Sequence, residues 1–277
     1  MSIPRSISTP PRLLTIAGSD SGGGAGIQAD LKTFAAHGVY GMSAITALTA
    51  QNTREVSAVL EVPPEMVAAQ IDAVFEDIGA DGVKIGMLAN AAIVRAVADR
   101  LRVHLQDRSI PVVLDPVMVA KSGDALLRDD AVEAILQDLL PLCTVVTPNL
   151  PELARMTGRP VGTEEERLAA AADLSARGAG IAVLAKGGHG EGDEVVDLLL
   201  QGGRVERYAG ARLAARSSHG TGCTLSSALA ARLAGGTPLP QAVEGAIVWL
   251  RGALAAAYPL GGGTGPVNHL YQWRKEA

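Results

Sequence analysis

Short apolar runs alternate along this chain with longer stretches of helical spacing. The apolar, often β-branched runs predict strands at residues 13–17, 39–48, 57–62, 83–85, 111–118, 144–147 and 181–185. Helical spacing predicts helices at residues 27–37, 64–78, 91–105, 130–140, 163–177 and 239–256, with two more beginning near residues 149 and 220. Because strands and helices alternate throughout, the pattern predicts a three-layer α/β/α sandwich around a mostly parallel sheet.

Two segments depart from this alternation. Residues 194–200 and 204–208 flank the turn Gln201-Gly202-Gly203, which predicts an antiparallel hairpin at the sheet edge. Residues 1–11 hold three prolines and several hydroxyl residues, which indicates a loose tail. No repeat, composition shift or low-complexity linker divides the rest of the sequence. We therefore expect residues 12–277 to form a single domain.

Composition indicates a sizeable core and narrows the choice of partners. The 277 residues are 48% hydrophobic and 19% charged, with a net charge of −5. No basic run exceeds two residues, which argues against nucleic acid or an anionic membrane as a partner. The sequence shows no apolar run of membrane-spanning length and no secretory pattern, and its two cysteines suit a reducing compartment. We expect a soluble, cytoplasmic protein.

The most informative stretch is His219-Gly220-Thr221-Gly222-Cys223-Thr224. Its two glycines precede a run of Ala, Leu and Ser, which predicts a loop that enters a helix. Unpaired N–H groups and the dipole at such a terminus attract anions, and the same field is expected to lower the pKa of Cys223 and favour its thiolate. A phosphate cradle that contains a potential base suits phosphoryl transfer. The alternative is an ordinary glycine loop with a buried cysteine.

A second glycine-rich loop, residues 18–26, follows the first predicted strand. The dinucleotide fingerprint fails there because Ile27 stands where its third glycine belongs, and no Gly-Lys-Ser/Thr completes a P-loop. An NAD-dependent oxidoreductase is therefore the weakest option. The loop instead places Asp30 one turn into the next helix, either as a functional group or as a partner of the helix dipole. Gln51 follows a strand end, where ligands gather in open α/β sheets.

Three oxygen-bearing side chains follow later strands. Asp115 lies in the apolar run 111–118, and Asn149 and Glu152 lie three residues apart at a predicted helix start. If these side chains converge, they would suit Mg²⁺, which takes oxygen ligands and keeps several waters. The spacing alone also describes a helix capped by Asn149, with Glu152 set against the dipole.

Together, these motifs closely resemble the hydroxymethylpyrimidine and phosphomethylpyrimidine kinases of thiamine biosynthesis, which belong to the ribokinase-like superfamily. Two long segments carry the resemblance, namely Thr15–Asp20 with Gly23–Thr33, and His219–Thr224. Shorter matching segments are residues 45–48, 50–53, 84–88, 120–124, 147–152 and 186–189. The resemblance therefore covers nearly the whole chain.

The resemblance implies a reaction, its cofactors and its residues. The reaction is ATP-dependent phosphorylation of 4-amino-5-hydroxymethyl-2-methylpyrimidine on its 5-hydroxymethyl group, and then of the monophosphate to the diphosphate. The implied cofactors are ATP and Mg²⁺, with a monovalent cation as a further candidate, and the implied assembly is a homodimer. By this resemblance, Asp30 and Gln51 bind the pyrimidine in a pocket lined by Gly18, Met87 and Val117. The resemblance also implies that Mg²⁺ and its waters are organised by Asp115, Asn149 and Glu152, and that Lys186 contacts phosphate. It further implies an anion hole at Gly220, Thr221 and Gly222, with Cys223 in place of the aspartate base that most of the superfamily carries.

Alternatives remain within and beyond this resemblance. Gly22 stands where the family often has serine, which removes a hydroxyl from the loop and puts fine substrate contacts in question. Cysteine-bearing relatives that phosphorylate pyridoxal or pyridoxine share these motifs, so a vitamin B6 kinase is the enzyme alternative. A non-catalytic pyrimidine-binding regulatory protein is the alternative of another class, although a mere binder would not need the whole set of charged residues and Cys223. We expect His219 to be a loop residue without a chemical partner.

Overall fold

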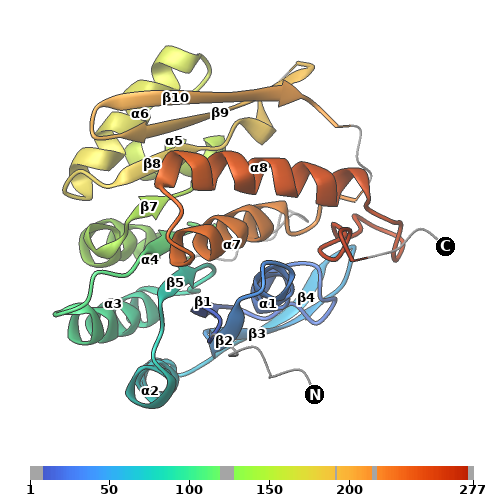
Figure 1. Ribbon diagram of the computed structural model, residues 1–277. Helices are drawn as coiled ribbons and strands as arrows, with labels where there is room; N and C mark the ends of the chain where they lie inside the picture. The colour runs from blue at the N-terminus through green and yellow to red at the C-terminus, as the bar shows by residue number, and fades with distance from the viewer. Residues whose placement is uncertain (1–8, 119–127, 191, 214–216, 274–277) are drawn as a thin grey trace, which may run out of the picture.

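The computed structural model describes residues 9–118, 128–190, 192–213 and 217–273, and an eight-stranded sheet runs through its middle (Figure 1). The strands are β1 (Arg12–Ala17), β2 (Tyr40–Ile45), β5 (Gly82–Ile85), β6 (Val112–Leu114), β7 (Val145–Val146), β8 (Ala182–Ala185), β9 (Glu194–Gln201) and β10 (Arg204–Ala211). Their spatial order is β10-β9-β8-β7-β6-β5-β1-β2. Pairing is parallel from β2 to β8 and antiparallel for β9 and β10, which confirms the predicted sheet and its edge hairpin.

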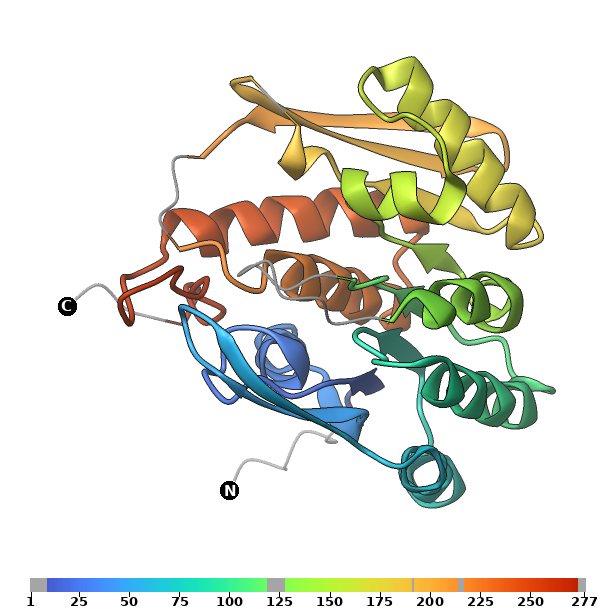
Figure 2. The same cartoon turned by 180° about the vertical axis from the view of Figure 1, so that it is seen from behind.

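Helices cover both faces of the sheet and complete the three layers. One face carries α1 (Gly26–Ala36), α7 (Thr221–Ala234) and α8 (Leu239–Ala255) (Figure 1). The other carries α2 (Pro64–Ala73), α3 (Ala91–Leu105), α4 (Asp129–Ala134), α5 (Leu150–Thr157) and α6 (Glu164–Arg177) (Figure 2). Because successive strand side chains point to opposite faces, Leu13 and Leu14 enter different hydrophobic clusters, one on each side of the sheet.

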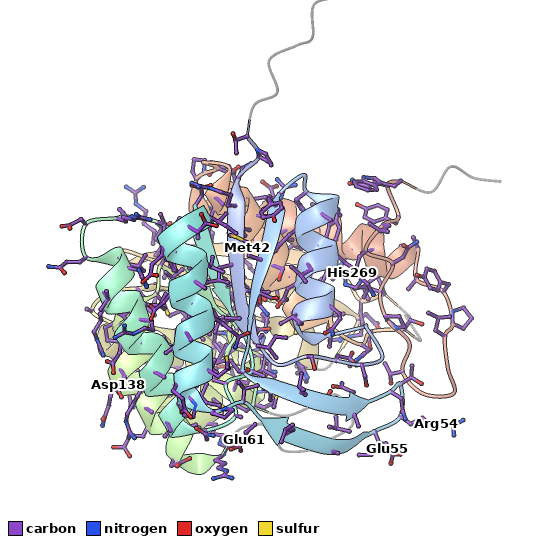
Figure 3. The ribbon with its side chains drawn as sticks, turned by 90° about the horizontal axis from the view of Figure 1, so that it is seen from below. Met42, Arg54, Glu55, Glu61, Asp138 and His269 are labelled. Carbon is purple, nitrogen blue, oxygen red and sulfur yellow. The ribbon has the colours of Figure 1, made fainter. Side chains whose placement is uncertain are left out.

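Several predicted elements end earlier than the sequence pattern indicates. The predicted strand 39–48 breaks at Thr46 into β2 and β3 (Ala47–Gln51). The strand β3 pairs with β4 (Val56–Glu61) in a separate antiparallel sheet, and Arg54 and Glu55 lie at its outer end (Figure 3). The predicted strand 111–118 keeps only residues 112–114 as β6, because Pro116 has no N–H for a sheet ladder. The helix predicted to reach residue 78 leaves regular α geometry after Ala73 and closes with a wider π-helical turn.

The parallel strands bring their carboxyl ends to one edge of the sheet. Gly18 follows β1, Met87 follows β5, Asp115 follows β6, Asn149 follows β7 and Lys186 follows β8. The strand order reverses at β1: β2 lies next to β1 on one side, and the later strand β5 lies next to it on the other. Such a switch in strand order opens a crevice at the carboxyl edge, where ligands bind in open α/β sheets.

Part of the expected organisation falls outside the described residues. This applies to residues 1–8 of the expected tail and to the motif at residues 120–124. Within the described ranges, no helix is both long and apolar enough to cross a membrane.

Candidate active site

A cavity of about 780 Å³ opens at the carboxyl edge of the sheet, beside the start of α7. Twelve of the thirteen residues predicted for the site line this cavity, and Asp30 does not. The lining residues among those predicted are Gly18, Gln51, Met87, Asp115, Val117, Asn149, Glu152, Lys186, Gly220, Thr221, Gly222 and Cys223. The structure therefore brings together side chains that lie more than 200 positions apart in the sequence.

The start of α7 has the glycine conformation and the unpaired helical N–H groups that its sequence predicts. Gly220 takes the left-handed conformation, with φ of 78°, and any side chain there would collide with the carbonyl oxygen of Gly24. The N–H of Thr224 makes the first intrahelical bond, 2.8 Å to the Gly220 oxygen. The three preceding N–H groups, at residues 221–223, have no partner within the helix and lie at its positive end. Such a terminus favours an anion, and the phosphate cradle stays a prediction.

A buried ion pair faces this terminus. The Lys186 ammonium lies 2.7 Å from Asp115 Oδ1, and the two side chains are 12% and 2% exposed. A methyl group on Gly222 would lie 3.3 Å from Asp115 Oδ2 and 3.4 Å from the Lys186 nitrogen. Burial acts to lower the pKa of Lys186, but Asp115 and Glu152 outweigh it and raise the pKa. Lys186 therefore stays charged beside the helix terminus, where it can contact a phosphate.

Asn149 and Glu152 form a capping box at the start of α5. The Asn149 side chain accepts from the Glu152 N–H at 2.9 Å, and Glu152 Oε2 accepts from the Asn149 N–H at 2.8 Å. The capping interpretation of this spacing is thus correct, yet both residues also line the cavity. Burial raises the pKa of Glu152 to about 7, with Lys186 acting against this rise and Asp115 adding to it.

The carboxylates of this site fit a magnesium ion that is shared with a substrate. Among the described residues, no three His, Cys, Asp or Glu side chains gather closely enough to hold a metal by themselves. Asp115 and Glu152 nevertheless supply two carboxylates to one cavity. Mg²⁺ in phosphate-transferring sites commonly takes one or two carboxylates together with phosphate oxygens and waters. The donor set is therefore suited to Mg²⁺ bound with a nucleotide.

The expected thiolate at Cys223 is wrong for the substrate-free chain. Burial is the largest cause of a rise in the pKa of Cys223 to about 11. The charge on Lys84 and the N–H of Gly26 act against this rise, while Asp30 and Asp115 add to it. Desolvation of the charged form thus outweighs the attraction of the helix terminus. Cys223 is mainly a neutral thiol at neutral pH.

Asp30 lies behind the cavity rather than in its wall, which corrects the predicted ring-binding role. Its side chain is fully buried and forms an ion pair with Lys84 at 2.9 Å. It also accepts hydrogen bonds from the Thr15 hydroxyl at 2.6 Å and the Ser227 hydroxyl at 2.7 Å. The face of α1 that carries Asp30 turns toward the sheet and α7, so its carboxylate has no open side for a ligand.

His219 has a chemical partner, contrary to our expectation. Its Nε2 lies 2.8 Å from Asp20 Oδ2 and 3.4 Å from the side-chain nitrogen of Gln51. Asp20 also accepts from the N–H groups of Gly22, Gly24 and Ala25 at 2.8, 3.0 and 2.8 Å. Burial acts to raise the pKa of Asp20, but the bonds from His219 and these amides lower it. The N–H groups of the first glycine loop are therefore occupied by an internal carboxylate, that of Asp20.

Sequence reasoning also missed the side chains that shape the turn after Lys186. The Arg212 guanidinium donates to the carbonyl oxygens of Gly188, Gly190 and Gly192 at 2.9, 2.7 and 2.8 Å. Asp197 accepts from the N–H of Gly187 at 2.7 Å. Both Arg212 and Asp197 line the same cavity as the Asp115–Lys186 pair. No local pattern in the sequence signals these contacts, because each partner comes from a different strand or turn.

Comparison with solved structures first defines the class of protein. An ADP complex of pyridoxal kinase from Bacillus subtilis superposes with a TM-score of 0.87 at 34% identity, covering 96% of this chain and 100% of that one. Phosphomethylpyrimidine kinase from Clostridium difficile 630 superposes with a TM-score of 0.76 at 40% identity, covering 87% and 98%. The fold is that of the ribokinase-like kinases, which confirms the expected architecture.

Comparison of sequences then defines the family. Residues 20–268 match the phosphomethylpyrimidine kinase family. The chain is 54% identical over 265 residues to hydroxymethylpyrimidine/phosphomethylpyrimidine kinase of Rhizobium meliloti, which covers 95% of this chain and 98% of that relative. The chain belongs to the phosphomethylpyrimidine kinase family.

Proposed function

We propose that this chain is an ATP-dependent kinase of thiamine biosynthesis. It phosphorylates 4-amino-5-hydroxymethyl-2-methylpyrimidine to the monophosphate and then phosphorylates the monophosphate to the diphosphate. The observation that carries this proposal is the α7 terminus facing the Asp115–Lys186 pair, so close that a methyl group on Gly222 would touch both side chains. An anion cradle, a fixed cation and a carboxylate at one point are the parts that phosphoryl transfer needs.

The phosphate end of the site stabilises charge on the transferred group. The N–H groups at residues 221–223 and the Lys186 ammonium contact the γ-phosphoryl oxygens. Asp115 and Glu152 hold Mg²⁺, which neutralises phosphate charge when it is bound. Asn149 belongs to the same group, because its cap bonds fix Glu152 in place. The turn held by Arg212 borders the nucleotide.

The other end of the cavity receives the pyrimidine. Gly18 and Met87 lie in close contact, because a methyl group on Gly18 would lie 3.0 Å from the Met87 sulfur. Together with Val117 they present an apolar wall, and Gln51 offers a side-chain amide that can read ring nitrogens. An apolar wall beside a side-chain amide suits an aminopyrimidine ring. Its hydroxymethyl group points toward Cys223.

Cys223 receives the hydroxyl proton of the substrate. Because its pKa is about 11, the thiolate is a minor species at neutral pH, and the site spends most of its time with a neutral thiol. A loose transition state demands little deprotonation of the attacking oxygen before the phosphoryl group moves. Positioning and charge stabilisation therefore carry most of the rate enhancement, and the minor thiolate form of Cys223 takes the hydroxyl proton to complete the step.

The test is ADP release by the purified chain with Mg-ATP. Hydroxymethylpyrimidine, its monophosphate and pyridoxal are compared at matched concentrations. Turnover of both pyrimidines, with pyridoxal much slower, is the expected result. Faster turnover of pyridoxal with an inert pyrimidine monophosphate would instead support a vitamin B6 kinase, the second candidate favoured by the likeness to the Bacillus subtilis structure. Tight pyrimidine binding without any turnover would support a regulatory binder. Repeating the assay with K⁺ replaced by choline tests the monovalent cation.

We also propose that the chain works as a homodimer in the cytoplasm. The paired strands β3 and β4 set Leu48 opposite Leu60 on an apolar face, and these side chains are 46% and 66% exposed. A second copy covering this face would remove them from water. Leu60→Asp is expected to produce monomers in sedimentation experiments, whereas Val103→Asp on the equally exposed surface of α3 should not. Monomeric wild-type protein would contradict the assembly. Free Cys143 and Cys223 agree with a reducing compartment.

A further inference from the structure

A lysine and an aspartate are sealed inside the molecule beneath the start of α7, and the reaction outlined above gives them no part. Lys84 lies in β5, between β1 and β6, where parallel strands are normally apolar. Its ammonium lies 2.9 Å from the Asp30 carboxylate, and both side chains are 0% exposed. A charged pair in this position requires a physical explanation.

The pair is held rigidly by groups from four elements. Asp30 on α1 accepts from Lys84 on β5, from Thr15 on β1 and from Ser227 on α7. Gly86 leaves the space that the ammonium fills, because a methyl group there would lie 2.8 Å from the Lys84 nitrogen. Burial acts to lower the pKa of Lys84, but Asp30 and the neighbouring Cys223 and Asp115 raise it. Lys84 therefore carries a positive charge at neutral pH.

This charge is directed toward the reaction centre. Ser227 follows Cys223 by one helical turn, so both side chains lie on the same face of α7. Since Ser227 bonds to Asp30, the ion pair lies under the face that carries Cys223. Lys84 is also among the residues that border the cavity. Its charge lowers the pKa of Cys223, against the effects of burial, Asp30 and Asp115.

Stability alone does not account for the pair. Removing two charges from water is so unfavourable that an apolar pair of similar volume is often as stable or more stable, whereas removing one partner alone is strongly destabilising. We propose that Lys84, held in place by Asp30, is a positioning residue for the transfer step: its fixed charge stabilises the Cys223 thiolate before the step and the negative charge that develops at the attacking oxygen during the step. This inference rests on the proposed role of Cys223.

The transfer step moves one proton and one phosphoryl group. The substrate hydroxyl gives its proton to the Cys223 thiolate, and its oxygen forms a bond to the γ-phosphorus of ATP. The bond between that phosphorus and the bridging oxygen breaks, and ADP leaves with the electron pair. Lys84 exchanges no proton. It favours the thiolate before the step and offsets negative charge during the step.

The experiment compares Lys84→Met, Asp30→Asn and the double variant with the wild type. Each single variant leaves one buried charge unpaired and is expected to melt at a lower temperature. The double variant removes both charges, so it should regain most of the wild-type melting temperature. Its kcat is nevertheless expected to fall about tenfold to a hundredfold, with KM for both substrates within about twofold of the wild type. The control is the double variant Arg12→Met with Asp81→Asn, which removes a more exposed ion pair. Arg12 lies in β1, and Asp81 directly precedes β5.

A second readout does not depend on turnover. The rate at which iodoacetamide modifies Cys223 at pH 8, followed by peptide mass spectrometry, reports its thiolate fraction, and the double variant should react more slowly than wild type and control. Gly86→Ala keeps both charges but displaces the ammonium, so it should lower kcat in the same direction. A double variant with wild-type kcat and wild-type alkylation would overturn the inference, as would a folded Gly86→Ala variant with wild-type kcat. Wild-type protein without pyrimidine turnover would instead refute the proposed function, and the alkylation result would still stand on its own.

Discussion

Replacing Glu152 by glutamine should stabilise the chain at alkaline pH. The pKa of Glu152 is about 7 in the folded chain, against an ordinary value of 4.5, and burial is the main cause. Between these two values the unfolded chain has lost the proton that the folded chain keeps, so the free energy of unfolding falls as pH rises. Above pH 7 the folded chain carries the full cost of the buried negative charge. The difference between the two pKa values corresponds to a loss of about 3 kcal/mol in the free energy of unfolding.

Glutamine removes this titration while keeping the shape of the side chain. Its oxygen can still accept from the Asn149 N–H, so the cap on α5 persists. Near pH 4.5, where Glu152 is protonated in the folded chain, wild type and Glu152→Gln should have similar stability. At pH 8 the variant should be more stable by about 3 kcal/mol, while its kinase activity falls because a carboxylate of the site is gone.

Urea unfolding in EDTA, followed by circular dichroism from pH 4.5 to 8, measures this difference. Comparing the variant with the wild type at each pH cancels the titration of all other groups. Glu166→Gln makes the same substitution in the exposed capping box of α6 and reports the effect of changing a cap alone. A difference between wild type and Glu152→Gln that stays constant with pH, or that favours the wild type more at pH 8, would refute the reasoning.

Three further substitutions test other parts of the site. Cys223→Ala should lower kcat by ~10²–10⁴-fold in the ADP-release assay, as for loss of a general base; near-native kcat would remove Cys223 from the chemistry. In the wild type, alkylation of Cys223 should accelerate steadily with pH toward its pKa of about 11, and a plateau near pH 7 would contradict the buried thiol. Gly220→Ala should lose about 1–2 kcal/mol from its left-handed backbone alone, with more from the collision with Gly24, and should raise KM for ATP. His219→Ala should loosen the loop held by Asp20 and raise KM for the pyrimidine about tenfold, while KM for ATP stays unchanged. An equal rise in both KM values would assign His219 a general structural role.

The strand-end residues were predictable because topology acts on them in a simple way. Asp115, Asn149 and Lys186 each follow a parallel strand, and parallel strands end at one edge of their sheet. Glycine conformation was equally readable, since a loop entering α7 needs Gly220. The roles of the other site residues were predicted from sequence motifs that resemble those of a known kinase family. These features are local, or follow from the order of elements alone.

The failed predictions concern burial and distant partners. The direction in which the pKa of Cys223 shifts depends on how deeply the thiol is buried, and no local sequence pattern gives that depth. The family resemblance implied that Asp30 binds the ring, whereas its burial against Lys84 depends on the direction of its helix face, which the sequence does not give. His219 and Asp20 are separated by 199 positions, so their contact exists only once the two loops meet. Such cases need three-dimensional packing rather than sequence spacing.

The buried pair of Asp30 and Lys84 also constrains how the chain can be made. During synthesis Asp30 emerges 54 residues before Lys84, which balances its charge, and 197 residues before Ser227, which donates a further hydrogen bond to its carboxylate. The helix α7 that closes the arrangement comes from the last quarter of the sequence. Premature termination before α7 therefore yields a chain that lacks the anion cradle and the Ser227 hydrogen bond to Asp30. Quality control in the cell would meet an open, protease-sensitive polypeptide rather than a partly active kinase.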